Sequence, residues 1–83
     1  MNKIILGVML KQRIETATKF QDLLTEYGCY INTRIGLHTS ETESCSPMGL
    51  VLLEVAGGQE EKAAELEKKL LEIGGIVVQK MVF

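Results

Sequence analysis

The residues best equipped for chemistry lie in and around residues 33–50, "TRIGLHTSETESCSPMGL". This segment holds the chain's only histidine, His38, and one of its two cysteines, Cys45; the other is Cys29. Imidazole and thiolate are ligands for zinc, nickel and copper, and a structural zinc ion usually takes four of them. One chain offers three, at a spacing that matches no standard signature, so we expect no cofactor. The alternative is a metal-responsive module with His38, Cys45 and Cys29 as ligands shared across an oligomer interface.

Nucleophilic catalysis would require Cys45 or Cys29 to be activated by His38. Two carboxylates, Glu41 and Glu43, shortly precede Cys45 in the same polar loop, and negative charge disfavours the reactive thiolate. No third residue is recognisable that would orient the imidazole. The sequence therefore predicts a protein that is not an enzyme, without catalytic residues.

A candidate recognition surface comes from the alternating segment 29–38, "CYINTRIGLH". Alternation is typical of a half-buried strand that has one apolar and one polar face. The polar face is predicted to bind a small ligand or a partner, although a plainly solvated strand face has the same pattern. Its candidate binding residues are Tyr30, Asn32, Arg34 and His38.

The elements that position these residues follow from hydrophobic patterning. Residues 3–10 form a continuous apolar run that predicts a central strand. Residues 13–28 have the three-and-four spacing of a helix, with Gly28 at the position of a left-handed helix end. After the polar connection, residues 48–56 predict a second apolar strand, antiparallel to the strand at 29–38.

The last third of the chain predicts a helix and a closing strand. Residues 57–75 begin and end with glycine pairs and contain helical spacing, with Glu65 and Lys69 placed for an ion pair one turn apart. Residues 76–83 predict a strand. The order predicts one domain, residues 1–83, of the α+β class. It is a ferredoxin-like βαββαβ sandwich, a four-stranded antiparallel sheet with two helices on one face.

The sheet face without helices is predicted to be apolar. If Val51, Leu53 and Val55 point towards the helices, the alternate residues of the strand point away, and these are Met48, Leu50, Leu52 and Glu54. A sheet that is apolar on both faces needs a second cover. We therefore expect a homo-oligomer, a dimer or higher, that associates through Met48, Leu50 and Leu52.

Composition excludes several classes of function. The net charge of -2 and the scattered basic residues argue against direct nucleic-acid binding. No apolar run is long enough to span a membrane, and the short apolar start ends in Lys11-Gln12-Arg13 without a signal-peptide cleavage site. Two cysteines without a repeated spacing indicate a reduced, cytoplasmic setting.

One further inference rests on resemblance. The strand end Arg34-Ile35-Gly36, the polar loop through Pro47, the apolar strand from Gly49 to Gly57 and the closing "GGIVVQKMVF" resemble the iron-only hydrogenase system regulator family. This resemblance implies an ACT-like fold and a stand-alone regulatory module, linked to iron-only hydrogenase by the family's name. Its implied partners are a small-molecule effector or a partner protein.

Overall fold

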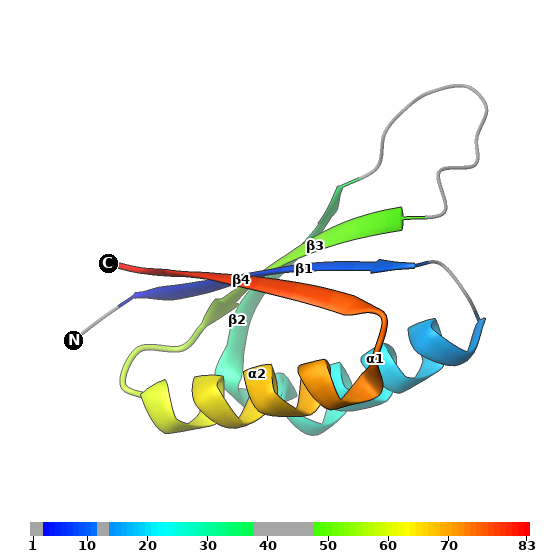
Figure 1. Ribbon diagram of the computed structural model, residues 1–83. Coiled ribbons are helices and arrows are strands. Elements are labelled where there is room, and N and C mark those ends of the chain that lie inside the picture. The colour runs from blue at the N-terminus through cyan, green and yellow to red at the C-terminus, as the bar shows by residue number, and fades with distance from the viewer. Residues whose placement is uncertain (1–2, 12–13, 38–47) are drawn as a thin grey trace.

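The structure of the protein is a computed structural model that describes residues 3–11, 14–37 and 48–83. Its elements follow the predicted order of strand, helix, strand, strand, helix, strand (Figure 1). They are β1 (Ile4–Lys11), α1 (Ile14–Glu26), a 3-10 turn η1 (Gly28–Tyr30), β2 (Ile31–Leu37), β3 (Met48–Val55), α2 (Glu60–Ile73) and β4 (Ile76–Val82).

The four strands form one antiparallel sheet in the order β2-β3-β1-β4. The two long connections through α1 and α2 both cross on the same side, so both helices cover one face of the sheet (Figure 1). Over the other face, residues 3–11, 14–37 and 48–83 place no further layer. The predicted ferredoxin-like βαββαβ sandwich is confirmed.

The core lies between the sheet and the two helices. Alternate residues of β1 and β3 point into it, as the register of Leu6 with Leu53 and Ile4 with Val55 requires. The helices contribute Phe20 and Leu70, which are almost fully buried in the same core. Every buried residue in the described ranges is hydrophobic, so packing rather than buried charge stabilises the fold.

Two glycine predictions had different outcomes. Gly74 and Gly75 adopt φ values of 87° and 72°, which L-residues rarely adopt, and they turn the chain from α2 into β4. Gly28 was predicted to end the first helix in the left-handed conformation, and this was wrong. The α-helix ends at Glu26, and Gly28 begins the 3-10 turn η1 without a positive φ.

A β-bulge breaks the alternation predicted for residues 29–38. Ile31 pairs with Val55, whereas Thr33 pairs with Glu54, so Asn32 is an extra residue on β2. Ile31 therefore packs against the core, while Thr33, Ile35 and Leu37 share the open face. An unbroken alternation along residues 29–38 predicts that Ile31 points the same way as these three residues. That prediction was wrong, because one added residue reverses the direction of every later side chain.

Candidate interaction surface on the open sheet face

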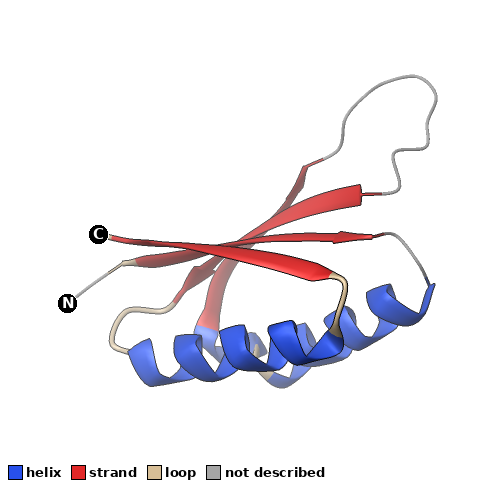
Figure 2. Ribbon diagram, viewed as in Figure 1, coloured by secondary structure: helices blue, strands red, loops and turns tan. Residues whose placement is uncertain are grey.

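The open face of the sheet is lined by apolar side chains from all four strands. Figure 2 shows the helices on the opposite side of the sheet only. Met9 on β1 is 38% exposed, Ile35 on β2 47%, Val77 on β4 53% and Met81 on β4 48%. Exposed apolar side chains that lie together on one surface are usually covered by another molecule. The open face is therefore the strongest candidate for an interaction surface.

The register places the predicted residues of this face. Leu50 pairs with Met9 and Leu52 with Gly7, so both leucines point away from the helices, as predicted. Both are half-buried by their neighbours within the sheet. Met48 begins β3 opposite Lys11, and its side chain lies outside the described residues. The role of these residues in association stays a prediction.

One charged group on the open face is compensated within the chain. Glu54 forms an ion pair with Lys3 and accepts a hydrogen bond from the Thr33 hydroxyl at 3.0 Å. The hydrogen bond from Lys3, then that from Thr33, and the positive charge of Lys3 lower the pKa of Glu54 below its usual 4.5. At neutral pH this carboxylate is ionised but its charge is balanced locally.

The predicted binding residues on the polar face of segment 29–38 are distributed over different environments. Tyr30 belongs to η1 and packs partly buried against the core, with the Lys62 ammonium 5.3 Å from its ring centre. Asn32 is exposed at the bulge. Arg34 is exposed opposite Leu53, on the helix-facing side of β2. His38 lies outside the described residues.

Arg34 faces the helix side of β2, yet its side chain is exposed, because β2 is an edge strand of the sheet. It is therefore accessible to a ligand or a partner. Tyr30, by contrast, has a packing role: its ring lies 6.2 Å from that of Tyr27, centre to centre. Of these two predicted binding residues, Arg34 is therefore available for binding, whereas Tyr30 stabilises the packing of η1.

Of the candidate metal ligands, the structure describes one. Cys29 is a free, exposed cysteine in η1. His38 and Cys45 lie outside the described residues. Within residues 3–11, 14–37 and 48–83, no three His, Cys, Asp or Glu side chains gather closely enough to hold a metal ion.

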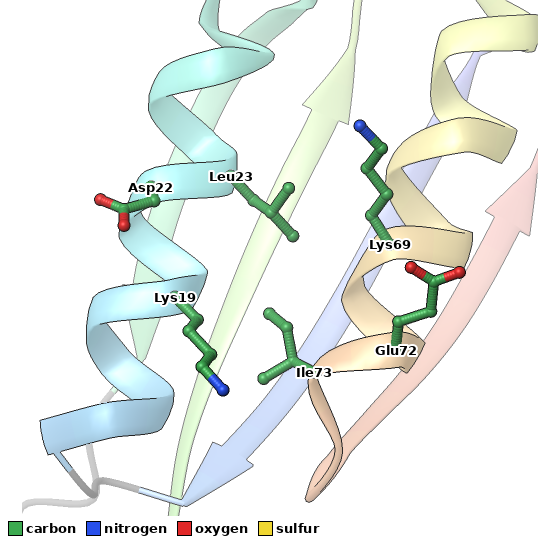
Figure 3. Close-up of a pocket in the computed structure, with 6 residues that line it drawn as sticks. All are labelled: Lys19, Asp22, Leu23, Lys69, Glu72 and Ile73. Carbon is green, nitrogen blue, oxygen red and sulfur yellow. The ribbon is translucent and has the colours of Figure 1, made fainter.

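A shallow groove of about 330 Å³ lies between the two helices (Figure 3). Leu23 of α1 and Ile73 of α2 form its apolar part. Its charged side chains are all exposed and of both signs: Lys19, Asp22, Lys69 and Glu72. Without a buried polar group to orient a ligand, this groove is the ordinary seam between two packed helices.

The polar links between the helices differ from the predicted one. Lys69 was expected to pair with Glu65 on the same helix. Instead its ammonium lies 3.4 Å from Glu26 of α1, and Glu65 accepts a hydrogen bond from the Tyr27 hydroxyl at 3.2 Å. Hydrogen bonds to Tyr27 and Glu26 raise the pKa of Lys69 above its usual 10.5. These contacts link α2 to the C-terminal end of α1.

Sequence reasoning missed part of the open face. It identified the residues of β3 but not Ile35, Leu37, Val77 and Met81, which extend the apolar surface to both edges of the sheet. For β4, the two-residue period of a strand places Val77, Gln79 and Met81 on one face, and this spacing could have identified the two apolar residues. For β2, the bulge at Asn32 concealed it, because it shifts the apolar residues to the other face.

No family model matches the chain, and no curated protein matches it. Solved structures do. An uncharacterised protein of Thermotoga maritima superposes with a TM-score of 0.80 at 21% identity, over 100% of this chain and 99% of that one. The ACT domain of GTP pyrophosphokinase from Chlorobium tepidum superposes at 0.72 with 11% identity, over 95% and 96% of the two chains.

A third similar structure is CPII, a nitrogen regulatory PII-like protein of Thiomonas intermedia, with a TM-score of 0.61 at 13% identity. The match covers 100% of this chain and 93% of CPII. At these identities the likeness concerns the fold alone. The chain therefore has an ACT-like, ferredoxin-like fold. Neither helix in the described ranges is long and apolar enough to cross a membrane.

Proposed function

We propose that this chain is a small, non-catalytic regulatory module that acts in the cytoplasm as a homo-oligomer. The observation that carries the proposal is the open face, where four strands expose apolar side chains that a single chain leaves uncovered. The fold also supports it, since ACT and PII-like domains are among the structures it resembles. The resemblance of Arg34-Ile35-Gly36 and the following strand makes iron-only hydrogenase regulation the process we propose.

The proposed recognition site is the exposed segment of β2 around Arg34, with Asn32 and with His38, which follows β2 in the sequence. The guanidinium of an exposed arginine is suited to carboxylates and phosphates, which it can bind through two parallel hydrogen bonds. We therefore expect a small anionic effector or an acidic patch on a partner protein. CPII is bound to ADP, AMP and bicarbonate in its structure, so these three anions are the first probes.

Native mass spectrometry of untagged protein, purified without a chelator, tests the proposal. We expect an integer multiple of the chain mass, with retention of one of the three anions that is lost in Arg34→Ala. A mass of one chain at high concentration would contradict the homo-oligomer. Retention of the anions by Arg34→Ala would contradict the site. An additional transition-metal mass, lost in His38→Ala, would instead support the metal-responsive alternative.

A further inference from the structure

On the open face, β1 carries no side chain at Gly7, in the middle of the strand that lies between β3 and β4, and we call this position the Gly7 depression. In register, Gly7 is flanked by Leu52 on one side and Gln79 on the other. Along β1, the next residues on the same face are Ile5 and Met9. Four side chains thus surround a position that has none, and the backbone is exposed there to whatever covers the sheet.

Nothing within the described chain requires glycine at this position. Gly7 has no positive φ. A Cβ added to it would lie 3.6 Å from Leu52 Cδ2 and 3.9 Å from the Gln79 carbonyl oxygen, which are ordinary contacts. Glycine weakens the interior of a strand, where β-branched residues are favoured. A strand glycine often marks a bulge, a tight bend or a site where a ligand or another backbone approaches closely. The register of β1 with β3 and β4 has no shift at Gly7, so a bulge does not account for it.

We infer that the open faces of two copies of this chain pack against each other, with their closest approach at Gly7. This inference rests on the proposed homo-oligomer and specifies its interface. Two sheets packed face to face interleave their inner side chains. The depression at Gly7 receives a side chain of the facing copy, and a twofold axis gives each copy the same contact in return.

The charges on the open face favour a second copy as the occupant. Among its described side chains the carboxylate of Glu54 is the one acidic group, and Lys3 with Thr33 compensates it within the chain. Among the described side chains, the rest of the face is apolar except for Gln79 and Thr33, which are neutral. Lys11 shares this face in register with Met48, and its side chain lies outside the described residues. Over the described part of the face, two copies can meet without like-charge repulsion, whereas a strongly acidic or basic partner would find no uncompensated opposite charge.

The size of the face also suits self-association. Four strands about 4.8 Å apart, each of about seven residues rising about 3.3 Å, present roughly 450 Å² in projection. The accessible area of side chains on that surface is larger, so two faces together bury at least about 1,000 Å², the lower limit for a specific interface. The dimer is therefore expected to be reversible.

The test compares Gly7→Ala and Gly7→Val with a matched control, Gly36→Ala. Gly36 is also a strand glycine, but it is on the helix-facing side of β2, and a Cβ there meets nothing within 4 Å. Sedimentation equilibrium measures the dissociation constant of each dimer. Filling the depression in both copies is expected to weaken association about tenfold for alanine and about 100-fold for valine. The control should stay within about threefold of the wild type.

Urea unfolding at a concentration where the chains are monomeric supplies the second readout. Since a Cβ at Gly7 makes only ordinary contacts within one chain and glycine weakens the interior of a strand, Gly7→Ala should be at least as stable as the wild type there. Association of Gly7→Val with the wild-type constant would overturn the inference, as would loss of folding in both Gly7 variants. If the wild type is a monomer, the proposed oligomer fails. If Val77→Lys separates the dimer but Gly7→Val does not, only the Gly7 contact fails.

Discussion

The substitution Val77→Lys should weaken the association of this protein without unfolding it. Val77 is 53% exposed on the open face, where its register partner on β1 is Met9. Full burial of a valine is worth about 1.5–3 kcal/mol, so covering the exposed half on association contributes about 1 kcal/mol per copy. A twofold dimer loses this contribution twice, which corresponds to about a 30-fold weaker dimer.

The lysine charge adds little to this figure, because β4 is an edge strand and the long side chain can reach water. The matched control is Leu71→Lys. Leu71 is 52% exposed, nearly the same as Val77, but it belongs to α2 on the other side of the sheet. Both variants change the net charge from -2 to -1, so any long-range charge effect is common to the two.

Sedimentation equilibrium over a dilution series measures the effect, with circular dichroism to verify that each variant is folded. We expect Val77→Lys to dissociate at about 30-fold higher concentration than Leu71→Lys, which should match the wild type. Equal constants for both variants would refute the assignment of the open face. Weakening by Leu71→Lys alone would place the interface on the helices.

Three further predictions concern the fold. Leu70→Ala, at a core position with no exposed area, should lower the free energy of unfolding by about 3 kcal/mol in urea titrations; less than about 1 kcal/mol would mean that the core is packed differently. Tyr27→Phe removes the 3.2 Å hydrogen bond to Glu65 and should cost about 1 kcal/mol in the same assay, and an unchanged stability would show that the bond contributes nothing. The hydrogen bond from Lys3 lowers the pKa of Glu54, so the ionised carboxylate stabilises the folded state. This contribution to the free energy of unfolding is present above pH 4.5 and is lost as the pH falls through the lowered pKa. The wild type should therefore lose more stability between pH 6 and pH 3 than Glu54→Gln, and equal losses would contradict the pairing.

The order of elements was predictable because each has a strong local signal. The apolar run of β1 and the helical spacing in α2 decide their own conformation, and glycines such as Gly74 mark where the chain turns. The open face of β3 followed from the same alternation. Wherever local pattern and tertiary packing agree, sequence alone is sufficient.

The faces of β2 were not predictable, because a bulge depends on pairing with β3 rather than on the residues of β2. The apolar stripe at Ile35 and Leu37 therefore went unnoticed. Tyr30 was assigned to recognition since it falls in an alternating segment, yet it packs beside Tyr27 in a 3-10 turn. Lys69 likewise bonds to Glu26, a partner 43 residues away that no local spacing indicates.

Hydroxyl-radical footprinting of two methionines tests the central claim most directly. Met9 and Met81 lie on the open face and are 38% and 48% exposed in a single chain, whereas the exposed Cys29 lies in η1 and serves as the internal control. If open faces associate, oxidation of Met9 and Met81 should fall sharply as the protein concentration rises through the dissociation constant, while that of Cys29 stays constant. Oxidation of both methionines that is independent of concentration, in protein shown to be oligomeric, would contradict the account.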